Sequence, residues 1–358
     1  MSIDVRTRVS SAAPSFTEEE LVDHVIPDAV SRNGHLAARG LHFLDLPELG
    51  LDVGGHSVAI DGTRSSMTLR PDIENAGVVA RLSADALSDL LEDRASTIGL
   101  AMSERVKVTR GSITDWVRWE PVLRALIDGR KVHEPGDVTF VDLDGAPLPL
   151  DRSFALDDDR QEIAHFLTET GFLHLRGIFE PAEMEALSAD VDAWIGRATP
   201  DDGGSWWATD ESGQSQAVRV LFFHEKSEVL GPLLEDPRFN WIGGLTGDGH
   251  LPSGTAEGLV KPLGIVRGLS DLPWHKDCGQ GGHSYTCSGL TCGISATGAS
   301  RTSGALGVVP GSHRANTSAS GLDPTLDLEP ILLETETGDV TVHCSDTLHR
   351  AHPPVDRP

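Results

Sequence analysis

The apolar positions of this chain form two patterned regions with a weakly patterned stretch between them. In the first region, "HSVAIDG" (56–62) and "SSMTLRP" (65–71) alternate apolar with polar residues or carry β-branched ones, as short strands do. The segment "VVARLSADALSDLLEDR" (78–94) begins as a strand and continues as a helix, with Ser83 as its N-cap. These patterns predict a small α+β domain.

A second helix is predicted from Asp115, as its cap, to Gly129, where a glycine can end it. Apolar residues recur along one face of this helix at steps of three and four: Trp116, Trp119, Leu123 and Leu126.

The middle stretch, "DLDGAPLPLDRSFALDDDRQE" (142–162), is rich in Pro, Gly and Asp and has little apolar periodicity. It predicts a linker over residues 136–154. We therefore divide the chain into an N-terminal extension (1–30), a first domain (31–135), this linker and a second domain (155–358). A length of 358 residues also favours two domains.

The second domain begins with a helix, a strand and another helix. Gly171 is expected to end the first helix, and "FLHLRGIF" (172–179) has the pattern of a strand. Apolar residues mark one face of each helix: Ile163, Phe166 and Leu167 in the first, and Met184, Leu187, Val191 and Trp194 in the second. Both domains together predict an α+β protein.

Charge excludes some classes of partner. Acidic residues outnumber basic ones 55 to 29, a formal charge of −26, so a nucleic-acid backbone or an anionic membrane surface would be repelled. The N-terminus lacks an apolar signal core, and no stretch approaches 18 uninterrupted apolar residues. We expect a cytoplasmic protein without nucleic-acid partners or membrane insertion. Its four cysteines form no CxxC pair and are expected to be reduced.

Candidate metal chemistry begins at "WHKD" (274–277). In an extended strand, residues two apart point to the same face, so His275 and Asp277 can present an imidazole and a carboxylate to one point. A third ligand must come from elsewhere, and His349 lies 74 residues later (275 to 349) in "TLHRA", which has the pattern of a short strand. Two histidines and one carboxylate on one face leave three positions open, as in non-haem Fe(II) oxygenases.

Four stretches, in this order, resemble the phytanoyl-CoA dioxygenase family: "GFLHLRGIF", "WHKD", "GALGVVPGSHR" and "GDVTVHCSDTLHRA". The resemblance covers residues 155–358. It implies a double-stranded β-helix of the jelly-roll or cupin-like type, flanked by helices. It also implies that His275, Asp277 and His349 are the iron ligands.

Other histidines compete with His349 for the third position. His343 lies on the preceding predicted strand, "VTVHC", and His352 follows three residues after His349. The family likeness places the ligand in the "DTLH" step, which favours His349. His313, in "PGSH", is expected to be a hydrogen-bonded loop residue.

The order of elements over residues 31–130 resembles the sterol-carrier-protein-like fold, in which a sheet covered by helices encloses an apolar tunnel. This resemblance is one of pattern and carries no diagnostic motif. Trp116 and Trp119 are therefore expected to belong to the core rather than to contact a lipid.

The dioxygenase resemblance implies a reaction of Fe(II), the co-substrate 2-oxoglutarate and O2 that releases succinate and CO2. The expected outcome is hydroxylation of an aliphatic C–H bond of a small, hydrophobic substrate. Related halogenases carry a small residue in place of the carboxylate, so Asp277 favours hydroxylation or another oxidative outcome.

The resemblance also implies an arginine, roughly ten residues past the distal histidine, that binds the distal carboxylate of 2-oxoglutarate. Arg357, eight residues past His349, is the candidate in this sequence; the alternative, which we favour, is that the sequence stops short of this arginine. For the substrate, the segment around Trp206 and Trp207 suits a lid, although packing explains it equally well. His283, in a Gly-rich loop, is a further candidate substrate contact.

Two other classes of function remain open from the sequence. One is a hydrophobic-ligand binding protein whose oxygenase domain is catalytically silent. The other is a cupin-like zinc or manganese enzyme with the same three ligands, since imidazole and carboxylate accept several divalent ions. The substrate's identity and the oligomeric state are not predicted.

Overall fold

The computed structural model describes residues 16–253, 255–268, 272–278, 287 and 289–355. Contacts along the chain divide it into two compact units. The first unit comprises Met1–Thr139 with two later segments, His275–Cys287 and Ser312–Leu328. The second comprises Phe140–Trp274, Ser288–Gly311 and Glu329–Pro358.

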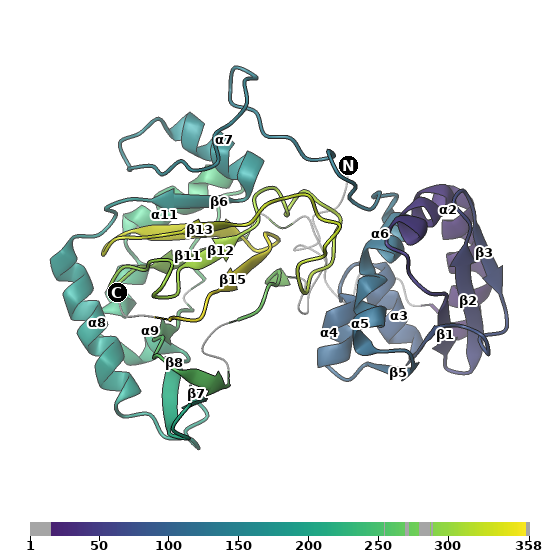
Figure 1. Ribbon diagram of the computed structural model, residues 1–358, viewed down its shortest axis with the longest axis horizontal. Coiled ribbons are helices and arrows are strands. Elements are labelled where there is room, and N and C mark those ends of the chain that lie inside the picture. The colour runs from purple at the N-terminus through teal and green to yellow at the C-terminus, as the bar shows by residue number, and fades with distance from the viewer. Residues whose placement is uncertain (1–15, 254, 269–271, 279–286, 288, 356–358) are drawn as a thin grey trace. The chain divides into compact units, whose positions relative to one another are not determined.

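The first unit is an α+β structure around a five-stranded sheet of order β3-β2-β1-β4-β5 (Figure 1). Its strands are β1 (Leu49–Val53), β2 (His56–Gly62), β3 (Met67–Arg70), β4 (Val78–Leu82) and β5 (Val106–Arg110). Neighbouring strands are antiparallel except for β1 and β4, which are parallel. The predicted strands at 56–62, 65–71 and the start of 78–94 are therefore confirmed.

Helices of the first unit occur before, between and after these strands. They are α1 (Glu18–Glu20), the π-helical η3 (Leu21–Val25), α2 (Ile26–Phe43), α3 (Ala84–Leu91), α4 (Thr97–Met102), α5 (Ile113–Arg118) and α6 (Glu120–Asp128). Ser83 caps α3 as predicted, because its side chain accepts a hydrogen bond from the Ala86 N–H. Helices α2 and α6 pack against each other.

The helix predicted from Asp115 to Gly129 is in fact two helices. Ser112 caps α5, and Asp115 is the acidic partner of this capping box rather than the cap itself. The break at Trp119 has a local cause, since Pro121 follows and has no N–H to continue the α5 hydrogen-bond ladder. Gly129 ends α6 in the left-handed conformation, as predicted.

Both tryptophans predicted for this region lie in the core of the first unit. Trp116 and Trp119 are fully buried. Their indole N–H groups donate to the carbonyls of Thr97 and Pro47, which satisfies the only polar atom that each side chain buries. The core role is confirmed; the resemblance of this unit to sterol-carrier proteins stays a prediction.

The second unit contains the helix, strand and helix predicted after the linker. They are α7 (Arg160–Thr170), β6 (Phe172–Leu175) and α8 (Pro181–Ile195), and Gly171 ends α7 in the left-handed conformation. Further helices are α9 (Phe223–Lys226), α10 (Leu230–Leu234), α11 (Pro237–Gly243) and the 3₁₀ turn η4 (Gly244–Thr246). Across the described residues of both units, no helix is long and apolar enough to cross a bilayer.

Strand β6 and the remaining strands of the second unit form three sheets, and several of their strands are labelled in Figure 1. Their orders are β10-β7-β8-β9, β11-β14-β6 and β13-β12-β15. The strands are β7 (Ser205–Asp210), β8 (Ser215–Val220), β9 (Gly258–Leu259), β10 (Ile265–Arg267), β11 (Leu290–Ile294), β12 (Leu306–Val308), β13 (Ile331–Leu333), β14 (Val340–Cys344) and β15 (His349–Ala351).

All pairings in these three sheets are antiparallel. The "VTVHC" and "TLHRA" strands are present as β14 and β15. These two strands belong to different sheets, yet the rings of His343 on β14 and His349 on β15 lie 4.0 Å apart between centroids. The two three-stranded sheets therefore approach each other at these strands.

Candidate metal centre

The first two predicted ligands lie on one short segment of the chain. His275 forms an isolated antiparallel bridge with Ser320, so the expected extended strand is reduced to a single bridged residue. The pair converges nevertheless, since His275 Nε2 lies 3.3 Å from Asp277 Oδ1. The imidazole is buried, and the carboxylate side chain is 35% exposed.

Lys276, between these two ligands, is fully buried. Its backbone N–H donates to the Ala319 carbonyl, and its Nζ donates to the carbonyls of Ser312 and Ala315. A buried ammonium group needs such partners, because leaving it unsatisfied would be costly. The sequence analysis missed this lysine, because its partners lie about 40 residues away in the sequence and no local pattern indicates them.

The third predicted ligand, His349, begins strand β15 and pairs with Val308 of β12. Its Nδ1 lies 2.9 Å from the Thr347 carbonyl oxygen, and the side chain is buried. A carbonyl oxygen only accepts, so the proton lies on Nδ1 and Nε2 carries the lone pair. Histidines that bind metals are commonly oriented by a hydrogen bond of this kind.

Among the described residues, His275, Asp277 and His349 form a group whose ligand atoms all lie within 4.8 Å of one another. Metal–ligand bonds of about 2.0–2.2 Å at right angles place two donor atoms about 3 Å apart. The separation of 3.3 Å between His275 and Asp277 suits a shared ion. Two imidazoles and one carboxylate are also the donor set that non-haem Fe(II) oxygenases use, so these residues fit an iron ion.

His343, the main competitor for the third position, is not part of this group. It is buried on β14, where its ring packs at a tilt against the ring of His349. His352 packs edge-on against Trp274, at 6.2 Å between ring centroids. His349, rather than His343, lies in the group with His275 and Asp277, and its role as the third ligand stays a prediction.

The other predicted site residues are less informative. Trp206 and Trp207 lie on β7, in a hairpin with β8, and are partly buried. The Arg219 guanidinium lies 4.3 Å from the centroid of the Trp206 ring, and the Trp207 indole donates to the Ser205 hydroxyl. His283 and Arg357 lie outside the described residues, so their roles stay predictions.

Two histidines and one carboxylate are the donor set of the non-haem iron oxygenases. The sequence then identifies the family: residues 167–355, which are 189 of the 358 residues, match the family described as Phytanoyl-CoA dioxygenase (PhyH). The chain belongs to this family. Fe(II) and 2-oxoglutarate are the cofactor and co-substrate of this class of dioxygenase.

Individual relatives are more distant. An ectoine dioxygenase from Bordetella bronchiseptica is 31% identical over 175 residues, which are 47% of this chain and 54% of that protein. The chain thus spans about half the length of this relative.

Solved structures also resemble the chain. AviO1 from Streptomyces viridochromogenes is 20% identical, with a TM-score of 0.44 over 56% of this chain and 90% of that one. EctD from S. alaskensis, with 2-oxoglutarate and 5-hydroxyectoine, is 16% identical, with a TM-score of 0.44 over 63% of this chain and 81% of that one.

Proposed function

We propose that this protein is an Fe(II)- and 2-oxoglutarate-dependent dioxygenase that hydroxylates an aliphatic C–H bond of a small, hydrophobic molecule and releases succinate and CO2. The observation that carries the proposal is the convergence of His275 Nε2 and Asp277 Oδ1 to 3.3 Å, in a chain that belongs to the phytanoyl-CoA dioxygenase family. His349, inside the same family match, completes the donor set.

In the proposed mechanism, bound iron supplies the centre at which O2 and 2-oxoglutarate react and a C–H bond is oxidised. The protein supplies position and charge. His275 and His349 offer neutral imidazole nitrogens, and the hydrogen bond from His349 Nδ1 to Thr347 holds that ring in one orientation. Asp277 offers a carboxylate, which offsets one positive charge of the ion and occupies the position that a halide would need.

The co-substrate and substrate contacts belong to the proposal as well. Arg357 is the residue in this sequence that we propose for the distal carboxylate of 2-oxoglutarate, because a guanidinium pairs with a carboxylate through two parallel hydrogen bonds. For the substrate we propose Trp206, Trp207 and His283. The name of the curated relative, ectoine dioxygenase, supports a small molecule as the substrate class.

Our proposal for the fold has two parts. The two three-stranded antiparallel sheets of the second unit would form the double-stranded β-helix, which is supported by the close approach of β14 and β15. The five-stranded sheet and helices of the first unit would form the sterol-carrier-protein-like domain.

The experiment measures succinate formation from 2-oxoglutarate in air, with and without Fe(II), using purified protein. We expect Fe(II)-dependent succinate formation, including slow turnover without a substrate, and we expect its loss in His275→Ala and in Asp277→Ala. His56→Ala, an exposed histidine at the start of β2 and outside the metal group, is the matched control and should retain the activity. Survival of succinate formation in both ligand variants would show that the site is assigned wrongly.

A further inference from the structure

We infer that Asn316 is a positioning residue for the metal centre, through which the N-terminal part of the first unit (residues 16–139) holds the segment that carries His275 and Asp277. The inference rests on the proposed metal site. It gives the N-terminal part a role in holding the metal-binding segment, separate from any small molecule that this part itself binds.

The first step is the attachment of the ligand segment to residues 312–320. The bridge between His275 and Ser320 and the hydrogen bond from the Lys276 N–H to the Ala319 carbonyl, 2.9 Å, tie the two backbones together. The buried Lys276 Nζ adds bonds to the carbonyls of Ser312 and Ala315, at 3.0 and 3.4 Å. The backbone between the two ligands therefore takes its position from residues 312–320.

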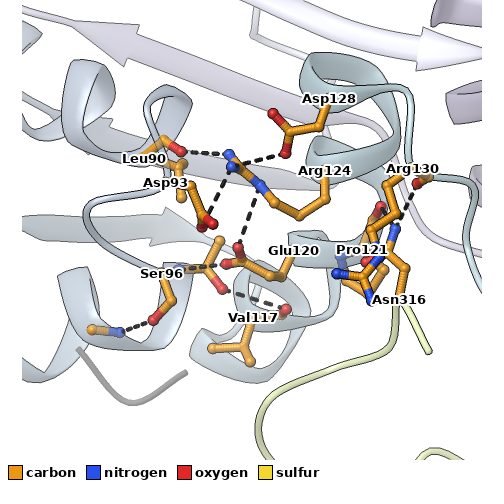
Figure 2. Close-up of polar contacts among 12 residues, drawn as sticks. Leu90, Asp93, Ser96, Val117, Glu120, Pro121, Arg124, Asp128, Arg130 and Asn316 are labelled. Carbon is orange, nitrogen blue, oxygen red and sulfur yellow. Dashed lines mark hydrogen bonds and ion pairs between the residues drawn. The ribbon is translucent and has the colours of Figure 1, made fainter. Parts of the chain in front are cut away.

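The second step is the attachment of these residues to helix α6. The Asn316 side chain is buried, and its Nδ2 donates to the carbonyls of Pro121, at 2.9 Å, and Arg130, at 2.8 Å (Figure 2). Pro121 lies in the first turn of α6, and Arg130 follows its glycine cap. The Asn316 carbonyl in turn accepts from the His133 N–H, at 3.0 Å. One side chain thus contacts the backbone of the first turn of α6 and of the residue that follows its glycine cap.

The third step is the rigidity of α6 itself. Arg124, on this helix, is fully buried and lies 3.2 Å from Asp128 Oδ2, 3.5 Å from Asp93 Oδ1 and 3.7 Å from Glu120 Oε1 (Figure 2). It also donates to the Leu90 carbonyl. Removing one partner from such a buried network is strongly destabilising, so α6 is a fixed support for Asn316.

A second anchor, Asp327, holds the longer segment Ser312–Leu328 near its end. Asp327 accepts from the Gly136 N–H at 2.7 Å, and its other carboxylate oxygen lies 2.7 Å from His133 Nε2. A small cavity lined by Pro121, His133 and Asn316 has room for about 10 Å³, roughly one water molecule. This cavity is too small for an organic ligand, which agrees with a mechanical role for the contact.

A metal site needs its ligands already in place, because any freedom of the ligand segment must be lost when the ion binds. The chain of contacts from Arg124 through α6, Asn316 and residues 312–320 to Lys276 limits that freedom. Loss of the Asn316 amide removes its two hydrogen bonds to the carbonyls of Pro121 and Arg130 and loosens residues 312–320. The expected result is weaker metal binding, with the ligands themselves unchanged.

The test measures Mn(II) affinity of the metal-free full chain by electron paramagnetic resonance, because this donor set accepts several divalent ions and Mn(II) does not oxidise readily. We expect Asn316→Ala to weaken Mn(II) binding by about tenfold, the lower end for residues that support metal ligands. Asn33→Ala is the matched control. Asn33 also donates from its side chain to α6 carbonyls, those of Leu126 and Ile127, but it lies on α2 and its hydrogen bonds go to α6 rather than to residues 312–320.

Equal Mn(II) affinity in Asn316→Ala and wild type would overturn the inference, as would an equal loss in Asn33→Ala. If Asn316→Ala does not fold, Asp327→Ala replaces it, since this partly exposed residue anchors the same segment; a folded Asp327→Ala with wild-type affinity would also overturn the inference. His275→Ala distinguishes a failure of the proposed metal site from a failure of the positioning role of Asn316. If it leaves Mn(II) binding unchanged, the proposed function fails; if it abolishes binding while Asn316→Ala does not weaken it, only the positioning role fails.

Discussion

At the scale of single residues, the orientation of His349 depends on the hydrogen bond from its Nδ1 to the Thr347 carbonyl. This bond orients the ring and leaves Nε2 as the nitrogen with the lone pair. His343 lies on β14, and its ring packs against the ring of His349 on β15. This contact makes His343 the strongest rival for the ligand role.

We therefore expect His349→Ala to weaken Fe(II) or Mn(II) binding by more than about 100-fold, beyond the effect of removing a supporting residue. His343→Gln should change it by less than about tenfold, because it alters only the packing beside the ligand. Metal titration of the two variants, with circular dichroism to check folding, measures this difference. The reverse order of effects would make His343 the ligand.

Residues that follow local rules could be predicted from the sequence. Ser83, Gly129 and Gly171 act within a few residues of their own position, and each has its predicted role. Asp115 was assigned wrongly as a helix cap, because Ser112 and Asp115 act together in one capping box and the sequence pattern alone does not show which one begins the helix.

At the scale of elements, Arg238 ties the starts of helices α8 and α11 together. Its guanidinium lies 2.8 Å from Glu183 Oε1 on α8 and 2.7 Å from Asp236 Oδ2, and it donates to the Ile178 carbonyl at 2.7 Å. Hydrogen bonds from Arg238 hold the pKa values of both carboxyl groups below their ordinary values.

Because the pKa values of Glu183 and Asp236 are lowered in the folded state, the stabilisation is present above pH 4.5 and is lost as the pH falls through the folded-state values. We expect Arg238→Met, which keeps the apolar stem, to lower the free energy of unfolding by about 1–2 kcal/mol at pH 7. Urea denaturation at pH 7, 5 and 3.5 should show this difference shrinking toward acid. A difference independent of pH would mean that Arg238 acts through packing.

Gly338 lies in the turn before β14, at a position where the backbone requires a glycine. It has φ +93°, and a Cβ there would lie 2.1 Å from the Phe179 carbonyl oxygen. Gly145 is the matched control, with φ +82° and open space around the position of a Cβ.

We expect Gly145→Ala to cost about 1 kcal/mol from backbone strain alone. Gly338→Ala should cost at least about 2 kcal/mol more, because the backbone of Phe179 must also move. Thermal or urea denaturation measures both. Equal costs would contradict the close approach of residue 338 to Phe179.

Elements were predictable where the apolar period was long and uninterrupted, as in α3, α7 and β14. The metal-ligand segment was predicted as a strand, yet His275 forms only an isolated bridge. This segment is held instead by the side-chain hydrogen bonds of Lys276 and by its pairing with residues 319–320. The partners of both contacts lie outside the segment, so its own sequence does not indicate them.

At the scale of the whole molecule, the sequence suggested two domains in succession. Contacts group two later segments, His275–Cys287 and Ser312–Leu328, with the N-terminal part of the chain. Such a grouping depends on side chains such as Asn316 and Asp327, whose partners lie almost 200 residues earlier. The spacing of apolar residues carries no information on contacts of this range, so the predicted boundaries remain a prediction.

The most direct test of the central claim is anaerobic calorimetry with the full chain, in which 2-oxoglutarate is titrated into protein with and without Fe(II). The proposal predicts binding of one 2-oxoglutarate per chain that requires Fe(II), and loss of that binding in Asp277→Ala. Binding that is the same with and without Fe(II), or no binding under either condition, would contradict an iron- and 2-oxoglutarate-dependent dioxygenase built on His275, Asp277 and His349.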